Sequence, residues 1–331
     1  SAAESVPGAI GLSSSTVSRG FVEASAAKLR EMQERDLSGE DVVAMVLDGK
    51  TFADEQIIPH AHDWHRQDQL IPIELIGQMS EMGVFGLTIP EIFGGHGLGK
   101  VAMCIVTEEL SRGYIGVGSL GTRSEIAAEL ILCGGTEAQK AHWLPKVGSA
   151  EILPTAVFTE PNTGSDLGAL RTRAVKTGED YAITGNKTWI THAARAHVMT
   201  LLARTDPDSH GSRGVSMFLV PRDAPGIAMT QIPKVGNNCM PSWEIGLDGV
   251  QVGAEALMGE EGKGFSGLMS TLHYSRASMA ATVLGCAQAA LDLTIAHAKE
   301  RQQFGRPIGS FQTIRHRIAD MQMRVDATRL V

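Results

Sequence analysis

The strongest constraint on the fold is a change in the spacing of hydrophobic residues, from helical to alternating and back to helical. Before residue 150, apolar side chains recur every three or four positions, as in the stripe from Ile73 to Met82, which is the period of an amphipathic helix. Residues 151–262 instead hold short alternating segments divided by Gly, Pro, Asp and Asn, which is typical of an antiparallel sheet. Helical spacing returns from Gly264. The order predicts an α+β protein.

These changes predict four regions: an N-terminal extension over 1–50, an α-helical domain over 51–150, a β domain over 151–262, and the start of a C-terminal helical domain over 263–331, only partly present. The expected helices dominate 52–82 and then cover 101–110, 124–132 and 136 to about 145. An extended connector is expected over 84–90. The expected strands are 181–184, 198–203, 215–220, 227–231 and 243–247.

The two ends of the chain carry further helix signals. Residues 1–20 are rich in Ser, Gly and Ala and are expected to be loose, while 21–35 has the spacing of an amphipathic helix. Ser38 is expected to cap a short helix through Leu47. Helical spacing also runs from Gly264 toward residue 297, and again from about residue 311 to the last residue.

Composition excludes several classes of protein. The chain has 29 Lys and Arg against 37 Asp and Glu, a net charge of −8, which disfavours nucleic-acid binding because that needs a basic face. No run approaches the roughly 20 apolar residues of a membrane span, and the N-terminus lacks a signal-peptide pattern. The four cysteines are widely spaced, so buried free thiols and a cytoplasmic location are expected.

The most informative motif has two halves, Thr159-Glu160-Pro161-Asn162-Thr163-Gly164-Ser165-Asp166 and Lys187-Thr188-Trp189-Ile190-Thr191. The first half has the composition of a turn, and such a turn offers backbone N–H groups and short hydroxyls to the polar edge of a ligand. The second half alternates like a strand and offers a flat ring and a hydroxyl to the same ligand. An ordinary hairpin with Trp189 in its core is the alternative interpretation of either half alone.

Together the two halves resemble the flavin-contacting segments of the acyl-CoA dehydrogenases, and the resemblance extends over roughly residues 55–331. It implies FAD as the cofactor, an acyl-CoA thioester as the substrate and electron-transfer flavoprotein as the electron acceptor. The family resemblance places the following residues against the flavin: Phe158, Thr159, Gly164, Ser165, Trp189, Ile190 and Thr191.

A second flavin contact is implied after the long C-terminal helix, in Arg301-Gln302-Gln303-Phe304-Gly305-Arg306. In the family, a matching turn reaches the flavin diphosphate of a neighbouring subunit, so Arg301, Phe304 and Gln312 are expected to bind FAD and the protein to be a homodimer or homotetramer. A guanidinium suits phosphate because its planar fork pairs with two oxygens. The alternative is a solvated, charged helix end.

The resemblance also implies substrate contacts from Ser165, His273 and Arg276. One branch of the family has its catalytic base at the position of Ser275, but a serine alcohol is a poor base at neutral pH. Most relatives carry the base on a later loop, so the base is expected beyond Val331 and remains unidentified.

Arg123 lies in a segment that relatives use to wall the acyl pocket. An arginine in an apolar pocket requires an anion, and two interpretations compete: a structural pair with Glu125 or a surface carboxylate, or a free carboxylate on the substrate. The segments 58–65, 107–113, 121–126 and 191–195 resemble a branch that oxidises a short branched dicarboxylic thioester, (2S)-methylsuccinyl-CoA, to mesaconyl-CoA. This resemblance favours the substrate carboxylate.

The expected function is therefore FAD-dependent α,β-dehydrogenation of that thioester. The alternatives are a dehydrogenase for another short branched acyl-CoA, a flavin- and acyl-CoA-binding protein without turnover, and an acyl-CoA oxidase. Three other motifs are weak. His60, His62 and His65 lack a second ligand group for a metal, Gly94 to Lys100 lacks the Ser or Thr of a phosphate-binding loop, and no serine has a nucleophile elbow.

Overall fold

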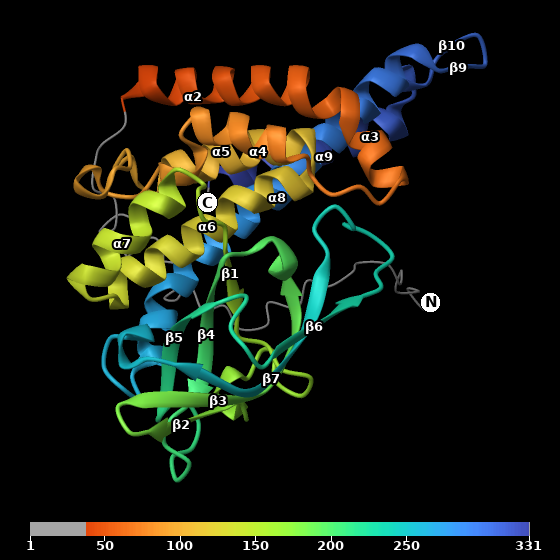
Figure 1. Cartoon of the computed structure of the whole chain (residues 1–331). Helices are drawn as coiled ribbons and strands as arrows, with labels where there is room; N and C mark the ends of the chain where they lie inside the picture. Colours follow the sequence, from red (N-terminus) through yellow and green to blue (C-terminus); the bar gives the residue numbers. More distant parts are fainter. Residues whose placement is uncertain (1–37, 331) are drawn as a thin grey trace, which may run out of the picture.

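A computed structural model describes residues 38–330 of the chain. Figure 1 shows a layer of helices above a twisted sheet, and the long helix α8 rising from the sheet through the helical layer. The order of elements is helical, then β, then helical, so the α+β architecture predicted from hydrophobic spacing is confirmed. The expected helix over residues 21–35 lies outside the described residues.

The N-terminal helical domain is built from short and medium helices, most of which pack around one apolar core, while the end of α6 and α7 pack in a second core shared with the sheet. Their bounds are α2 Gly39–Phe52, the π-helical turn η1 Ala53–Ile57, α3 Ile58–Arg66, α4 Ile73–Glu81, α5 Gly99–Gly113, α6 Ile115–Gly134 and α7 Glu137–Gly148.

Two helices of this domain begin with the capping signals that the sequence carries. Ser38 caps α2 and Thr136 caps α7, each in a reciprocal capping box with the residue three positions later, which satisfies backbone donors that a helix start leaves open. α2 continues past Leu47 and joins η1 and α3 without a break.

Two predictions for this domain are wrong. Residues 84–90 are not extended: Gly83 has φ +77°, and the chain then forms the 3₁₀ turn η2 Val84–Gly86, a left-handed step that glycine permits. α7 does not end at Pro145 but continues for one more turn to Gly148. A proline removes one hydrogen bond from a helix, and near the helix end that loss does not stop it.

The β domain is one sheet with strand order β6-β7-β3-β2-β4-β5-β8. The bounds are β1 Pro154–Val157, β2 Arg173–Thr177, β3 Asp180–Thr191, β4 Val198–Arg204, β5 Val215–Pro221, β6 Ile227–Ile232, β7 Ser242–Val252 and β8 Leu257–Met258. The five predicted strands are present. The sheet is not purely antiparallel, because β1 pairs with β4 in parallel, with Pro154 opposite Val198.

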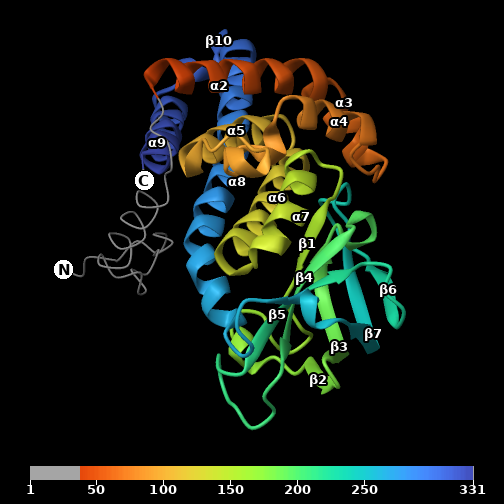
Figure 2. The same ribbon diagram turned by 60° about the vertical axis from the view of Figure 1, so that its left-hand side comes forward.

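The C-terminal part consists of α8 Gly264–Glu300, a short hairpin of β9 Gln302–Gln303 and β10 Arg306–Pro307, and α9 Gln312–Arg329. Figure 2 shows α8 running from the sheet to the level of α2, with α9 returning beside its upper half. Leu284, Leu291 and Val325 pack the two helices together.

Helix α8 is also the one helix in the described part of the chain that is long and apolar enough, by length and composition, to cross a membrane. No unbroken apolar run was expected here, because Gln288 and Asp292 interrupt the apolar sequence of α8. Since α8 packs against α5, α6 and α9, and core helices pass the same test, this is weak evidence.

The expectation of buried thiols also needs a correction. Cys239 is buried, Cys104 and Cys286 are half-buried, and Cys133 is exposed. Cys133 lies near the end of α6, where the helix leaves the apolar core.

Helices α5 and α8 approach closely at Gly285. A Cβ atom placed there would lie 2.1 Å from the carbonyl oxygen of Glu108 and 2.8 Å from the amide nitrogen of Arg112. Both contacts are with backbone, which cannot move aside as a flexible side chain could. The spacing of these two helices therefore requires glycine at this position.

We predict that Gly285→Ala lowers the free energy of unfolding by about 1–3 kcal/mol, the usual cost of overpacking, measured by urea denaturation. Gly267→Ala on the same helix is the control, because a Cβ atom there meets nothing within 4 Å. That control should be neutral or stabilising by up to about 1 kcal/mol, because alanine favours a helix. Equal effects of the two changes would contradict close packing at Gly285.

Candidate active site

The two halves of the sequence motif lie side by side. The amide nitrogen of Thr188 donates to the carbonyl oxygen of Thr159 at 3.0 Å, and the hydroxyl of Thr155 donates to the carbonyl oxygen of Thr191 at 2.8 Å. These bonds join the turn after β1 to the end of β3. The two motif halves therefore form one structural unit.

A buried ion pair between Lys187 and Glu160 holds this unit together. Lys187 Nζ donates to Glu160 Oε1 at 3.0 Å and to the carbonyl oxygen of Phe158 at 3.1 Å. The amides of Arg171 and Thr172 donate to the same carboxylate at 2.7 and 2.9 Å. The side chain of Lys187 has no exposed surface and that of Glu160 has 6%, so the pair ties the turn to β3 from inside.

Burial acts differently on the two partners. Burial raises the pKa of Glu160, but the charge of Lys187 and the hydrogen bonds outweigh it, so that pKa lies below its usual range. Burial lowers the pKa of Lys187 to about 8 against the pull of Glu160, since the ammonium has one carboxylate in place of water. Both directions leave the pair ionised at neutral pH.

The unit presents Trp189 to the outside. A β-bulge lies between Lys187 and Ile190, Trp189 has φ +58°, and its side chain is 57% exposed. Ile190 turns into the core of the sheet, so only its backbone can face a ligand there. The even alternation expected for this segment is not kept, because Lys187 and Thr188 are both buried.

The turn beside Trp189 is narrow and leaves its tip exposed. Glu160 and Thr163 exchange backbone hydrogen bonds of 2.8 and 3.0 Å, which closes the turn. Gly164 and Ser165 follow it and are exposed, while Thr159 is half-buried. An exposed aromatic face therefore lies next to a turn that offers hydroxyl and amide groups, which suits a planar ligand with a polar edge.

Arg123 on α6 does not form the structural pair with Glu125. Glu125 Oε1 instead lies 3.6 Å from Lys100 Nζ. Arg123 Nε is buried and has no hydrogen-bond partner among residues 38–330, and no salt bridge joins Arg123 to a described carboxylate. Burial lowers the pKa of its guanidinium to about 10. That interpretation of Arg123 is therefore wrong.

Further polar side chains surround Arg123, and the sequence motifs assign a role to none of them. His192 is 2% exposed, and neither ring nitrogen has a hydrogen-bond partner in the described structure. Burial, together with the charges of Arg195 and Arg123, lowers the pKa of His192 to about 3. Burial lowers the pKa of Lys234, and the charge of the nearby Arg123 also lowers it. The sequence feature that could have indicated these side chains is the run His-Ala-Ala-Arg directly after Thr191.

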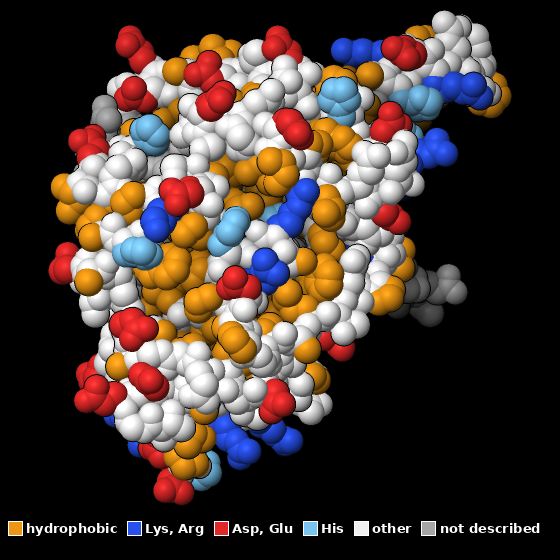
Figure 3. All heavy atoms as spheres, viewed as in Figure 1, with side chains coloured by type: hydrophobic (Ala, Val, Ile, Leu, Met, Phe, Trp, Pro, Cys, Tyr) orange, Lys and Arg blue, Asp and Glu red, His pale blue; other side chains and the backbone are white. Residues whose placement is uncertain are grey.

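Burying cations beside an imidazole without a hydrogen-bond partner is unfavourable unless an anion binds there. In the view of Figure 3, hydrophobic side chains gather between the helical layer and the sheet, with Lys, Arg and His side chains among them. The molecule thus presents a mixed apolar and basic surface where its two layers meet.

The α8 residues of the predicted substrate site lie alongside α6. Ser278 Oγ donates to Thr122 Oγ1 at 3.0 Å, which brings the Arg123 segment next to the α8 segment that carries Arg276. Arg276 is exposed and His273 is half-buried. Ser275 donates its hydroxyl to the carbonyl oxygen of Thr271 at 3.2 Å, so this hydroxyl is engaged within its own helix.

The predicted diphosphate contacts lie elsewhere. Arg301, Phe304 and Gln312 are exposed, at the β9–β10 hairpin and the start of α9, the end of α8 away from the sheet (Figure 1). α8 has 37 residues and is therefore about 55 Å long. One chain does not bring these residues to Trp189, so a site made of both sets requires two chains.

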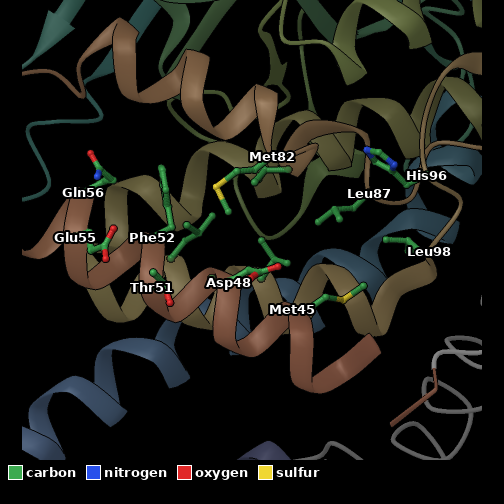
Figure 4. A pocket seen from close by; sticks show the side chains of 14 residues that line it. Met45, Asp48, Thr51, Phe52, Glu55, Gln56, Met82, Leu87, His96 and Leu98 are labelled. Atoms are coloured by element: carbon green, nitrogen blue, oxygen red, sulfur yellow. The ribbon is translucent and has the colours of Figure 1, made fainter. Parts of the chain in front are cut away.

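A cavity of about 540 Å³ lies apart from all these residues, between α2 and the layer of α4 and α5. Figure 4 shows Asp48 and Phe52 of α2 facing Met82, Leu87 and His96 across it. None of the predicted site residues lines it. Within residues 38–330, no group of three or more His, Cys, Asp or Glu is placed to hold a metal ion; His60 stacks on Trp64.

Comparison with known proteins decides the family. Models of the N-terminal, middle and C-terminal domains of acyl-CoA dehydrogenases match residues 40–151, 155–250 and 262–331. The chain belongs to the acyl-CoA dehydrogenase family.

Two curated relatives show how far the similarity extends. The chain is 57% identical over 290 residues to (2S)-methylsuccinyl-CoA dehydrogenase of Cereibacter sphaeroides, which covers 85% of this chain and 53% of that protein. It is 39% identical to glutaryl-CoA dehydrogenase of Desulfococcus multivorans, covering 85% of this chain and 73% of the relative. The chain thus spans about half the length of the first of these proteins.

Solved structures of the family have the same architecture. A glutaryl-coenzyme A dehydrogenase in complex with glutaryl-CoA has a TM-score of 0.86 at 38% identity, over 89% of this chain and 75% of that chain. A glutaryl-CoA dehydrogenase from Mycobacterium smegmatis in complex with FADH2 has 0.82 at 29%, over 92% and 77%. A structure titled as the electron transferring flavoprotein of Acidaminococcus fermentans has 0.85 at 31%, over 89% and 77%.

In this acyl-CoA dehydrogenase family member, we predict that Lys187→Met lowers the free energy of unfolding by about 3–5 kcal/mol, because it leaves Glu160 as an unpaired buried charge. The measurement is urea denaturation. Lys176→Met is the control: its ion pair with Glu261 has exposed side chains, at 58% and 42%, so its loss should cost less than about 1 kcal/mol.

The double variant Glu160→Gln with Lys187→Met should be more stable than Lys187→Met alone, since no buried charge is left without a partner. A Lys187→Met protein as stable as the Lys176→Met control would show that the buried pair does not hold the turn to β3.

Proposed function

We propose that the protein is an FAD-dependent dehydrogenase that oxidises a short branched dicarboxylic acyl-CoA, (2S)-methylsuccinyl-CoA, to mesaconyl-CoA. The observation that carries this proposal is Arg123, a half-buried residue whose buried Nε has no hydrogen-bond partner and which pairs with no carboxylate in the described structure. The chain that carries it is 57% identical to a methylsuccinyl-CoA dehydrogenase. Family membership supplies the reaction class, and the unpartnered guanidinium supplies the preference for a second carboxylate.

The residues near Trp189 fit a flavin. The exposed ring of Trp189 and the half-buried Phe158 would pack against the flavin ring, with Thr159, Ser165 and Thr191 as hydrogen-bonding groups at its edge. FAD supplies an acceptor for the hydride that leaves the β-carbon of the substrate. The ion pair between Glu160 and Lys187 keeps the turn and the strand in one arrangement, so the cofactor would meet a preformed surface.

Arg123 makes the proposed site specific for a substrate with a second carboxylate. A free carboxylate would neutralise the guanidinium and restore its pKa, and it would also relieve the repulsion between Arg123 and Lys234. His192, neutral at physiological pH, can donate one hydrogen bond to the same oxygens. On α8, His273 and Arg276 lie on the thioester side, together with Ser165 from the turn.

Two further parts of the proposal concern partners. Electron-transfer flavoprotein is the proposed electron acceptor, supported by the similarity to the Acidaminococcus fermentans structure. A homodimer or homotetramer is proposed because Arg301 and Gln312 are far from Trp189 in the same chain. The residue that takes the α-proton is not assigned among residues 38–330, and Ser275 is not a candidate because its hydroxyl is bonded within α8.

The first prediction tests the carboxylate site. Under anaerobic conditions, methylsuccinyl-CoA should bleach the yellow flavin of the purified protein. Arg123→Ala should raise the concentration needed for half-bleaching by roughly 100-fold or more, since losing a charged hydrogen-bond partner costs about 3 kcal/mol. Butyryl-CoA, which lacks the second carboxylate, should show the same half-bleaching concentration in both proteins, and Arg213→Ala, far along the β4–β5 connection, is the control variant.

Equal losses with both thioesters would remove the carboxylate role of Arg123. Bleaching by butyryl-CoA but not by methylsuccinyl-CoA would redirect the substrate, and peroxide formed in air without an added acceptor would favour an oxidase.

The second prediction tests the diphosphate contact. Arg301→Ala should lower the FAD-to-protein ratio after purification, because one bidentate contact to phosphate is lost. The ratio of flavin absorbance, at about 450 nm, to protein absorbance, at about 280 nm, measures how much flavin is retained. Arg317→Ala on the exposed surface of α9 is the matched control and should keep its flavin; an unchanged ratio in Arg301→Ala would contradict the shared site.

A further inference from the structure

A second buried charge cluster lies between α5, α6 and α8. Lys100 Nζ, in the first turn of α5, contacts the carboxylate of Glu129 and lies 3.6 Å from Glu125 Oε1. The same ammonium sits 4.5 Å from the centre of the Tyr274 ring on α8. The side chains of Lys100, Glu125 and Glu129 are 8%, 0% and 7% exposed, so the whole cluster is withdrawn from water.

The charges of this cluster do not balance if every group is ionised. Glu125 and Glu129 raise the pKa of Lys100 against the effect of its burial, so the ammonium stays charged. One ammonium with two carboxylates would leave a net charge of −1 in a dry site, which is unfavourable. The cluster becomes neutral when one carboxyl group keeps its proton.

The contacts indicate which carboxyl group that is. Glu129 has direct contact with Lys100, whereas neither oxygen of Glu125 has a hydrogen bond of ordinary geometry within the described structure. The Tyr274 hydroxyl also lacks such a bond, although it lies close enough to influence the Glu125 carboxyl. An ionised carboxylate with only the long contacts to Lys100 and Tyr274 is more costly than a neutral carboxyl group in the same place.

The electrostatics agree with the contacts. Burial and the charge of Glu129 raise the pKa of Glu125 against the opposing effects of Lys100 and Tyr274, and the net result is a pKa of about 7. Two thiols face the same cluster: Cys104 on α5, whose pKa burial raises to about 11, and Cys133 on α6, whose pKa burial also raises. Both are neutral near pH 7 and add no balancing charge.

One side of the cluster lies close to the surface. Cys133 Sγ lies 3.6 Å from Glu129 Oε1, and Cys133 also lines a cavity of about 260 Å³ between the end of α6, β5, β8 and the start of α8. Cys133 is itself exposed, so only one side chain separates Glu129 from the surface.

We propose that Glu125 is protonated in the folded protein at neutral pH and is a positioning residue: with Lys100 and Tyr274 it fixes α6 against α5 and α8, so that Arg123 faces the candidate site. Loss of the proton in alkaline solution places a second, unbonded carboxylate in the cluster and loosens this contact. The role in substrate binding rests on the proposed function; the protonation of Glu125 does not.

The test of protonation is the pH dependence of unfolding. Because the pKa of Glu125 is higher in the folded protein than in the unfolded chain, its contribution to stability is complete below the unfolded pKa and is lost as pH rises through the folded value. Relative to Glu125→Gln, the folded-to-unfolded ratio of the wild-type chain should fall by up to about tenfold per pH unit between about pH 4.5 and 7.

Glu137→Gln is the matched control, since Glu137 is an exposed residue of α7 with an 82% exposed side chain. Its curve should run parallel to the wild type. Parallel curves for wild type and Glu125→Gln would overturn the proposal.

If Glu125→Gln fails to fold, infrared difference spectra of the wild-type chain between pH 6 and pH 8 provide a second test. The carbonyl band of a protonated carboxyl group should be present at pH 6 and lost at pH 8. Glu129→Gln should lack this band at pH 6, because Glu125 then becomes the sole counter-ion of Lys100 and ionises. A wild-type spectrum without the band would overturn the proposal.

The positioning role has a separate readout. Between pH 6.5 and 8.5 the half-bleaching concentration of methylsuccinyl-CoA should rise by roughly fivefold in the wild type, at the lower end of typical coupling between sites, and stay constant in Glu125→Gln. Butyryl-CoA should show no such difference. Equal pH dependence in both proteins would overturn the positioning role. If methylsuccinyl-CoA bleaches neither protein, the proposed function fails, while the unfolding and infrared results still decide the protonation.

Discussion

The buried ion pair between Glu160 and Lys187 determines the shape of the candidate flavin surface. The carboxylate holds Lys187 fully inside, and the backbone amide of Thr188 donates a hydrogen bond to the carbonyl oxygen of Thr159. Two consecutive inward residues cannot belong to a regular strand, whose side chains alternate. The chain accommodates them with a bulge that turns Trp189 outward at positive φ. The exposed ring is thus a consequence of the buried charge.

Much of the architecture could be predicted from the sequence because the buried face of each helix or strand requires hydrophobic residues at a regular spacing. The capping boxes at Ser38 and Thr136 and the strands 198–204 and 215–221 are specified by neighbouring residues. The parallel pairing of β1 with β4 and the bulge at Trp189 depend on distant contacts, and no local spacing records them. Family resemblance found the turn and the strand but not the ion pair that joins them.

The alternative interpretation, in which Arg123 pairs with Glu125, is wrong for the same physical reason. Arg123 and Glu125 are close in sequence and opposite in charge, but residues two apart on a helix point in nearly opposite directions. The partner of Glu125 is Lys100 on another helix, and only the fold brings these two together. The two buried clusters also differ in kind. Glu160 and Lys187 satisfy each other, whereas Arg123 and His192 are left without partners, which is the pattern expected where a ligand supplies the missing charge.

Helix α6 connects the two clusters mechanically. Arg123 and Glu125 are separated by about 200° around the helix axis, so one faces the candidate site while the other faces α5 and α8. A rotation of α6 that relieved strain at Glu125 would necessarily swing Arg123 as well. The close approach of α6 to its neighbours, where a Cβ atom on Gly118 would lie 1.9 Å from Ser111 Oγ, leaves little room for such a rotation. On the proposed role of Glu125, its neutral carboxyl group is one of the contacts that hold α6, and with it Arg123, in this orientation.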